Sequence, residues 1–214
     1  MIQNALKNKL VFISSIIGFV AFFVQMNITL TRKMGEGFSF LYSLNHYLSY
    51  FTIIINLAVA VLLFFYSIYP HSKITIWFKK AVINGAFCLY ILIVGIIFYA
   101  LLYKDLKIYG VELLVSHTQH AYTPLVYFYF WFSEFRDSSL KYFDGVRWLI
   151  VPLIYFIYLM IRGQIIGKYP YFFVDIESSG IPKVALFATF ILLFFLLLGS
   201  VLIFIDRRFS AKAR

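Results

Sequence analysis

Two parts of this sequence hold residues that could perform acid–base or nucleophilic chemistry. His117 and His120 stand three residues apart in the segment SHTQHAYTPL, where a polar stretch gives way to the apolar run LVYFYFWF. Thr52 lies near the start of another apolar run, and Asn56 follows one helical turn later on the same face. A neutral imidazole within ~3 Å of an alcohol can take its proton. Residues of these types could therefore carry acid–base or nucleophilic chemistry.

The composition indicates that these residues belong to a membrane protein. Of the 214 residues, 63% are hydrophobic and only 13% are charged, and the mean hydropathy of +0.88 lies well above that of soluble domains. The apolar runs are continuous rather than alternating, which argues against an outer-membrane barrel. We predict an all-α bundle, a single membrane domain over residues 1–214. Six helices of close to the ~20 residues needed to cross a bilayer core are expected at 10–30, 47–69, 81–103, 118–133, 146–166 and 184–205.

The basic residues favour one orientation of the six predicted spans. If the N-terminus is cytoplasmic, 12 of the 19 Lys and Arg residues fall in inside segments and 7 in outside segments. This split predicts a multi-pass protein of the cell membrane with both ends in the cytoplasm. The net charge of +10 is spread over every loop instead of forming one basic stripe, so we expect no nucleic-acid partner.

The predicted topology brings the candidate residues to the outer side of the membrane. Thr52 is five residues into the second span, about 7.5 Å at the helical rise, and His120 is two residues into the fourth. Two neighbouring helices could therefore bring them together. Pro124 predicts that the fourth helix starts close to His120, because a proline costs little in the first turn. The same boundary holds His46, His117, Arg162, Tyr171, Asp175 and Glu177.

Each candidate also has a less specific interpretation. Interfacial histidines often only anchor a helix, and helical threonines usually bond the carbonyl four residues earlier. Asn56 and Asn84 are typical of residues that hydrogen-bond between helices. Arg162 is typical of an end-of-span cation whose side chain snorkels to the interface. Its partner would be a carboxylate head group, Asp175 or Glu177.

A metal-binding or transport protein is the alternative function. Such a protein would use His46, His117 and His120 as ligands, with Asp175 or Glu177 completing a three- or four-ligand zinc set. The H-x-x-H spacing is common, however, and H-E-x-x-H is absent from the sequence. The single cysteine forms no Cys-rich metal motif. We expect no metal and no cofactor.

Four segments of the sequence carry a resemblance to a known family. They are YFTIIIN (Tyr50 to Asn56), HAYTPLVYFYFW (His120 to Trp131), VRWLIVPLIYFIYLMIRG (Val146 to Gly163) and YPYFFVDI (Tyr169 to Ile176). In order and spacing, over residues 10 to 206, the chain resembles the bacterial six-span family called Pr-six-Pr. That family is similar in turn to the androgen-induced membrane proteins, which are threonine hydrolases that cleave fatty acid esters of hydroxy fatty acids.

The resemblance implies roles for individual residues. In those hydrolases, catalysis is carried by a threonine in a Y-[LF]-T stretch and by the second histidine of H-x-x-H-T just before a proline. These positions match Thr52 and His120, while His117 matches the first histidine, which has no assigned chemistry. The match departs at Ala121, where the hydrolases have threonine; Thr123 follows two residues on. The resemblance implies a membrane hydrolase that cleaves a lipid-like ester through Thr52 and His120.

An amphiphilic substrate would suit a pocket with apolar walls and polar groups at one end. We expect such a pocket to open toward the outer leaflet and to take a membrane lipid or fatty-acyl substrate. Its aromatic walls would include Phe51 and Tyr127, and Asn56 is the nearest candidate for an oxyanion donor. The residues expected to contact substrate are Asn56, His117, Arg162, Tyr50 and Tyr122.

Overall fold

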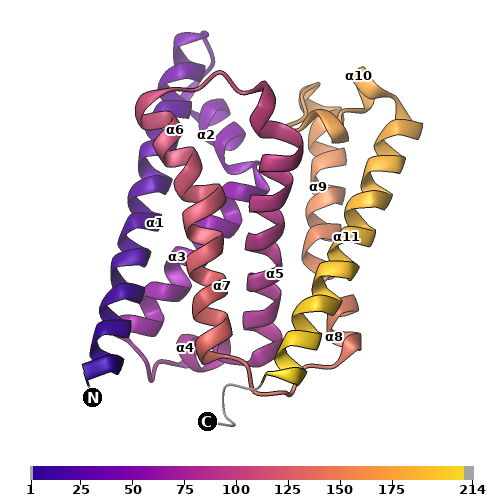
Figure 1. Cartoon of the computed structure of the whole chain (residues 1–214). Helices are drawn as coiled ribbons and strands as arrows, with labels where there is room; N and C mark the ends of the chain where they lie inside the picture. Colours follow the sequence, from indigo (N-terminus) through magenta and orange to yellow (C-terminus); the bar gives the residue numbers. More distant parts are fainter. Residues whose placement is uncertain (1, 210–214) are drawn as a thin grey trace. The chain divides into compact units, whose positions relative to one another are not determined.

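The computed structural model describes residues 2–209, and over that range every regular element is a helix (Figure 1). The predicted all-α class is confirmed. Five helical stretches are long and apolar enough to cross a membrane: Asn8–Gly35, Phe51–Ile68, Ala81–Asp105, Tyr142–Ile166 and Ile181–Arg208. These helices fit a membrane protein. They correspond to five of the six predicted spans, and the stretch predicted at 118–133 is not among them.

The chain divides into two compact units. The first runs to Asp137, and the second is Ser138–Ser210, of which residues up to 209 are described. The expectation of a single membrane domain stays a prediction.

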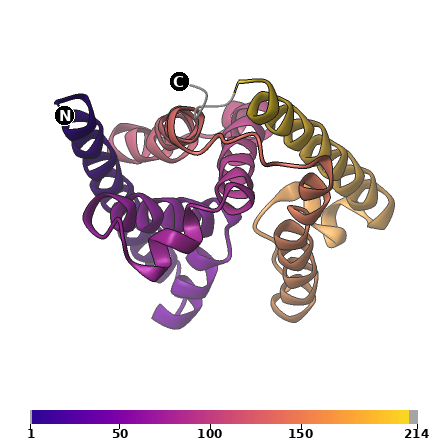
Figure 2. The same cartoon turned by 90° about the horizontal axis from the view of Figure 1, so that it is seen from below.

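The first unit contains four long helical rods that pack in a ring. Its early helices are α1 (Ile2–Gly35), α2 (Phe40–Leu48), α3 (Phe51–Ile68), α4 (Lys73–Phe78) and α5 (Ala81–Ile97). Helix α1 packs on α3, α3 on α5, α5 on α7 and α7 on α1 (Figure 2). A Cβ atom on Gly18 would lie 2.9 Å from the Ala60 Cβ atom, so α1 and α3 approach closely through small residues, as membrane helices do.

The fourth rod of this unit is built from three successive helices. They are α6 (Gly110–His117), the π-helix η3 (Thr118–Tyr122) and α7 (Thr123–Glu134). The backbone stays right-handed helical through both junctions, at His117 and at Thr123. These three helices form one continuous rod, which we call the α6–α7 rod. A second π-helix, η1 (Phe98–Leu102), and a 3₁₀ turn, η2 (Tyr103–Asp105), follow α5.

The prediction that Pro124 marks a helix start near His120 is wrong. The rod begins at Gly110 and passes through the proline, and the π turn is what accommodates it. The Thr123 N–H donates to the Thr118 carbonyl, five residues back instead of four. The Gln119 carbonyl is therefore left without a backbone donor. In an α-helix it would accept from the Thr123 N–H, which here donates to Thr118. In a π-helix it would accept from residue 124, which is a proline and has no N–H. A side chain from another helix must supply that hydrogen bond.

Helix α5 packs directly against this π turn. A Cβ atom on Gly95 would lie 2.6 Å from the His120 carbonyl oxygen and 3.2 Å from Pro124 Cγ. Only a glycine permits this approach, since the nearest atom belongs to the backbone and cannot rotate away. Gly95 therefore sets the distance between α5 and the segment that carries His120.

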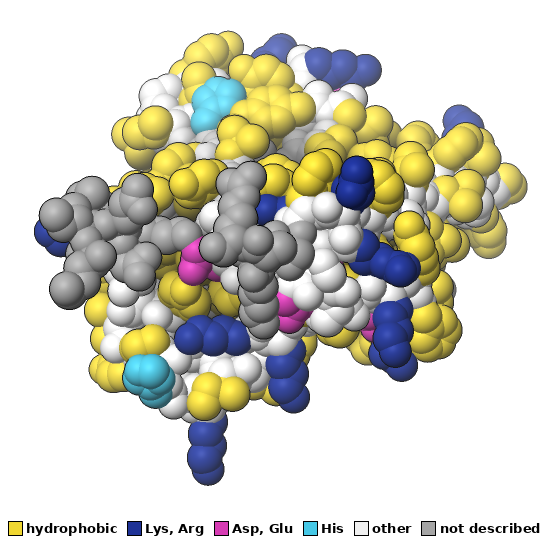
Figure 3. Space-filling view, turned by 60° about the horizontal axis from the view of Figure 1, so that its bottom comes forward, with side chains coloured by type: hydrophobic (Ala, Val, Ile, Leu, Met, Phe, Trp, Pro, Cys, Tyr) yellow, Lys and Arg dark blue, Asp and Glu magenta, His cyan; other side chains and the backbone are white. Residues whose placement is uncertain are grey.

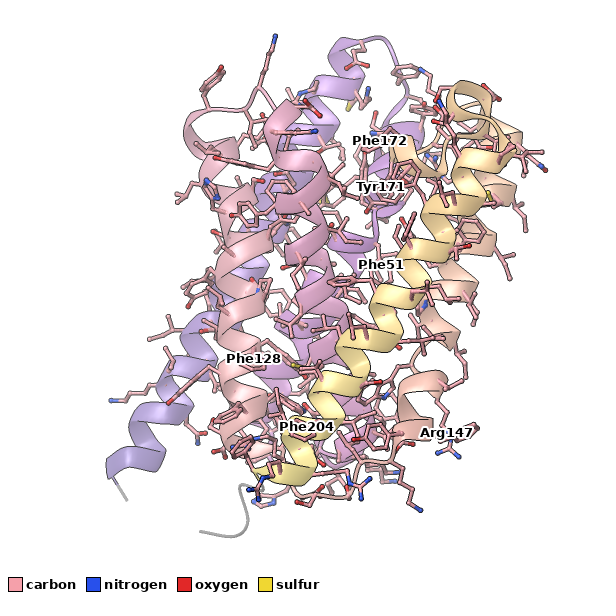
Figure 4. All side chains as sticks on the ribbon, turned by 45° about the vertical axis from the view of Figure 1, so that its right-hand side comes forward. Phe51, Phe128, Arg147, Tyr171, Phe172 and Phe204 are labelled. Atoms are coloured by element: carbon pink, nitrogen blue, oxygen red, sulfur yellow. The ribbon has the colours of Figure 1, made fainter. Side chains whose placement is uncertain are left out.

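The second unit contains two apolar helices joined by short elements. Its helices are α8 (Tyr142–Arg147), α9 (Ile150–Ile166), η4 (Phe172–Val174), α10 (Ile176–Ser179) and α11 (Ile181–Arg208). Figure 4 labels Tyr171 and Phe172 in the segment between α9 and α10. At the other end, the buried Asp206 carboxylate accepts backbone hydrogen bonds from Ser138 at 3.4 Å and from Leu140 at 3.2 Å.

The surfaces of the long helices are rich in exposed apolar side chains. In the second unit, Ile154 and Ile165 of α9 and Phe190 and Leu197 of α11 are each more than half exposed. Figure 3 shows one face of the molecule, on which hydrophobic side chains lie next to Lys and Arg side chains. Apolar faces of this extent are costly in water and fit a bilayer.

We predict that Gly95→Ala lowers the free energy of unfolding by about 1–3 kcal/mol, because the added methyl overpacks the π turn against backbone atoms. Gly35→Ala is the matched control, since Gly35 also lies in a helix and has nothing within 4 Å of its built Cβ. Its substitution should be neutral or stabilising by up to about 1 kcal/mol. Thermal unfolding of both variants in detergent micelles measures the difference. Equal midpoints for the two variants would contradict the assignment.

Candidate functional site

The turn that holds Thr52 and the π turn that holds His120 lie next to each other in the first unit. Asn56 of α3 joins them: its Nδ2 atom donates to the Thr52 carbonyl at 2.9 Å and to the Gln119 carbonyl at 3.2 Å. Those two carbonyl oxygens are therefore at most about 6 Å apart, the sum of two ordinary hydrogen bonds. Asn56 is the side chain that supplies the hydrogen bond which Pro124 cannot give.

This arrangement changes the interpretation of Asn56. The side chain is buried, and an amide nitrogen has two hydrogens, both of which are used within the protein. An oxyanion would have to displace one of these bonds. Asn56 therefore connects two helices, as the simpler interpretation expected, and its predicted role as oxyanion donor is not supported by its hydrogen bonds.

The hydrogen bonds of His120 define which ring nitrogen can act as a base. Its Nδ1 atom lies 2.8 Å from the carbonyl oxygen of Ser116, one turn earlier in the rod. A carbonyl only accepts, so Nδ1 carries the proton and Nε2 holds the lone pair. The ring also stacks on Phe98, with centroids 3.6 Å apart and planes at 13°. His120 is thus fixed in orientation and tautomer, with a basic nitrogen on its other edge.

Thr52 differs from two other helical threonines, Thr118 and Thr189. The Thr118 and Thr189 hydroxyls donate to the carbonyls of Leu114 and Ala185, each at 2.9 Å and four residues earlier. Thr52 is the second residue of α3, so the residue four positions before it lies in α2 instead. The side chain is half-buried. Among the described residues, no hydrogen bond joins its hydroxyl to the His120 ring.

Two predicted substrate contacts, His117 and Tyr122, make hydrogen bonds within the protein. The Tyr122 hydroxyl lies 3.0 Å from Ser14 Oγ and ties the π turn to α1. His117 Nδ1 lies 2.6 Å from the hydroxyl of Tyr99 in η1. Both side chains are half-buried, so each also presents part of its surface outward.

The remaining aromatic residues of the predicted pocket fall at different depths. The Tyr50 hydroxyl lies 3.4 Å from His46 Nε2, and Tyr50 immediately precedes α3. Phe51, labelled in Figure 4, packs edge-on against Tyr90, with centroids 6.2 Å apart. Tyr127 is fully buried and donates to Asn84 Oδ1 at 2.8 Å. Tyr127 is therefore part of the core of this unit, whereas Tyr50 and Phe51 stay at its half-buried edge.

Arg162 lies in the second unit, and its environment there overturns one interpretation. Its side chain is only 5% exposed, and Nη1 donates to the Lys168 carbonyl at 3.0 Å across the turn that ends α9. A snorkelling cation would extend into solvent, so that interpretation is wrong. Arg162 helps to shape the end of α9, which Gly167 closes in the left-handed conformation with φ of 67°. A pocket shared by Arg162 and Thr52 stays a prediction.

The segment after α9 places Asp175 and Glu177 around a tyrosine. Asp175 caps α10 by accepting from the Ser178 N–H at 3.0 Å. The ring of Tyr169 packs against Gly163, where a Cβ would overlap it. Burial, and then the Glu177 and Asp175 carboxylates, raise the pKa of Tyr169 above its usual value. These acidic residues thus act within their own segment of the second unit.

The histidines do not form a metal-binding set. His46 contacts Tyr50, His117 contacts Tyr99 and His120 stacks on Phe98. Over the part of the chain that the structure describes, no group of three or more His, Cys, Asp or Glu side chains lies close enough to hold a metal ion. The ligand set that the metal-binding alternative requires is not assembled there.

Gln119 is a site residue that the sequence analysis missed. Its side chain is 3% exposed, and among the described residues no acceptor lies within hydrogen-bonding distance of its Nε2 atom. The sequence held only part of the signal, since it shows that Pro124 removes a backbone donor from the helix. Which carbonyl is left without that donor depends on the π turn, which the sequence does not show.

Comparisons of the chain with protein-family models, with curated proteins and with solved structures found no match. The resemblance to the Pr-six-Pr family and to the androgen-induced hydrolases therefore stays a prediction. What the geometry contributes is a half-buried threonine, a histidine of defined tautomer and the amide bridge that holds their two turns together.

We predict that Asn56→Leu destabilises the protein by about 1–3 kcal/mol, because the buried Gln119 carbonyl loses the donor that replaces the proline N–H. Asn27→Leu is the matched control, since Asn27 lies on an exposed position of α1. It should be neutral or stabilising. Thermal unfolding in detergent compares the two. If Asn56→Leu unfolds at the same temperature as Asn27→Leu, the bridge does not support the π turn.

Proposed function

We propose that this protein hydrolyses a lipid-like ester, of the fatty acid ester of hydroxy fatty acid type, with Thr52 as nucleophile and His120 as general acid and base. The observation that carries the proposal is the hydrogen bond from His120 Nδ1 to the Ser116 carbonyl. It leaves Nε2 as a proton acceptor, which is the state that a general base needs. The Asn56 bridge supports it further, because it keeps the turns of Thr52 and His120 together.

The chemistry proceeds in two halves. In the first, Thr52 Oγ1 attacks the ester carbonyl carbon and passes its proton to His120 Nε2; the tetrahedral intermediate then collapses, and the leaving alcohol takes that proton. In the second, His120 Nε2 takes a proton from water as the water attacks the acyl-threonine, and Thr52 regains its proton as the acid leaves. An imidazole held in one orientation suits both directions of transfer. Closure of the gap between hydroxyl and ring accompanies substrate binding, as apo active sites often require.

A lipid substrate fits the surroundings of these residues. Thr52, Tyr50 and Phe51 are half-buried at the start of an apolar helix, and His120 is half-buried in the rod. The ester group of a lipid lies near the membrane boundary, with its chains in the apolar region. An amphiphile would therefore bring its carbonyl to the polar residues while its chains follow the helices.

We also propose that the α6–α7 rod is a sixth transmembrane helix and that both ends of the chain are cytoplasmic. Its 25 residues, Gly110–Glu134, would extend about 37 Å at the helical rise, more than the thickness of a bilayer core. The polar segment SHTQH lowers its average hydropathy. The distribution of Lys and Arg supports the orientation.

For the catalytic pair, we predict that a fluorophosphonate labels the purified protein at Thr52, located by mass spectrometry. Thr52→Ala and His120→Ala should each lower esterase turnover by at least about 100-fold, since the nucleophile and the base act together. Thr52→Ser should keep part of the activity because it retains the hydroxyl. Thr189→Ala is the control, because that hydroxyl bonds only its own helix. Full turnover by Thr52→Ala would refute the mechanism.

For the topology, we predict that single cysteines placed at Gly37, Leu106 and Lys168 in a Cys88→Ala background react with an impermeant thiol reagent from outside intact cells. A cysteine placed at Ser72 should react only after the cells are opened. Cys88 is buried and should react weakly by itself. Labelling of the 106 position from the inside only would contradict both the sixth span and the proposed outer location of the site.

A further inference from the structure

We propose that Gln119 donates the hydrogen bond that stabilises the carbonyl oxygen of the ester during hydrolysis. This inference rests on the function proposed above and extends it, because it names the oxyanion donor. It starts from a buried amide nitrogen that donates no hydrogen bond to any described residue. Gln119 is 3% exposed, and no acceptor within the described residues lies in reach of its Nε2 atom.

Polar side chains near Gln119 in the α6–α7 rod have hydrogen-bond partners, some in neighbouring helices and some in the rod itself. Tyr122 pairs with Ser14 of α1, and Tyr127 pairs with Asn84 of α5. Asn56 of α3 uses both hydrogens of its amide on carbonyl groups. In an apolar bundle such pairing is strongly favoured, since a polar group without a partner is costly. The Gln119 amide departs from this pattern, which points to an acceptor supplied by a ligand.

The position of Gln119 suits the carbonyl oxygen of a substrate that Thr52 attacks. Its own carbonyl is at most about 6 Å from the Thr52 carbonyl, through the shared Asn56 amide. Gln119 also directly precedes His120 in the π turn. The side chain has three rotatable carbon–carbon bonds, so its amide can adjust to a bound ester without movement of the backbone. Nucleophile, base and donor thus come from two adjoining turns.

The amide would act at one defined step. As Thr52 Oγ1 bonds to the carbonyl carbon, the C=O π electrons move onto the carbonyl oxygen, and the hydroxyl proton moves to His120 Nε2. The Gln119 N–H donates to the oxygen that gains the charge, and keeps its own proton. When the intermediate collapses, the C=O bond re-forms and the alcohol leaves with the proton from His120. A neutral donor in a buried site stabilises such charge without reorganisation of solvent.

Gln119→Met tests the inference, because methionine keeps the length of the side chain and removes the donor. The assay uses the purified full-length protein in detergent with a 4-nitrophenyl ester of a fatty acid, and a fluorophosphonate whose P=O oxygen occupies the oxyanion position. We expect kcat to fall about 100-fold with KM changed less than threefold, and labelling of Thr52 to slow by a similar factor. The unfolding temperature without ligand should stay the same or rise, because an unpaired buried donor has been removed.

Gln25→Met of α1 is the matched control, since its amide donates to Thr29 within the same helix at 3.4 Å. It should leave turnover and labelling unchanged. The inference is overturned if Gln119→Met keeps the kcat of the parent protein. It is also overturned if Gln119→Met loses activity and unfolds at a lower temperature, because Gln119 would then have a structural role.

Thr52→Ala separates the two proposals. If Thr52→Ala is inactive while Gln119→Met is fully active, the hydrolase proposal stands and only the Gln119 inference fails; if Thr52→Ala is active, the hydrolase proposal fails and Gln119 fails with it.

Discussion

The missing N–H of Pro124 is the constraint on which the arrangement of the first unit depends. A helix that contains an internal proline loses one backbone donor, and inside a bundle no water replaces it. Here the helix widens into a π turn, and the carbonyl left over at Gln119 accepts from the Asn56 side chain of α3. The same turn presents the His120 carbonyl to Gly95 of α5 at a distance that only glycine tolerates. The N–H that Pro124 lacks thus affects how α3 and α5 pack against the α6–α7 rod.

Hydrogen bonds between helices hold the polar residues of this unit in place. Tyr122 connects the rod to α1, Asn56 connects it to α3 and Tyr127 connects it to α5. Such bonds are directional, whereas apolar packing alone tolerates sliding of one helix along another. Their combined effect is to fix the height of the π turn relative to the first turn of α3. A half-buried threonine and a histidine with a defined tautomer are therefore presented from two turns whose separation is set by the protein.

The second unit is stabilised in a different way. Its polar groups satisfy the ends of helices: Asp206 accepts from backbone N–H groups after Asp137, Arg162 donates to the turn after α9, and Asp175 caps α10. Between these ends, α9 and α11 expose large apolar side chains over most of their length. Polar ends and apolar middles are the pattern that a bilayer requires, since it supplies water only at its two surfaces.

The sequence alone determined the class of the protein, because long apolar runs leave a helix as the only way to satisfy the backbone in lipid. It also predicted that Thr52 and His120 lie at similar depth along two spans that could be neighbours. It could not reveal the π turn. That turn depends on whether a neighbouring side chain can donate a hydrogen bond to the carbonyl that the proline leaves without a donor. Tertiary structure decided that Asn56 fills this role and that the Gln119 amide nitrogen has no hydrogen-bond partner within residues 2–209, which the structure describes. It also decided that Arg162 is buried, since burial depends on the fold of the turn after α9 and not on the position of a charge along a span.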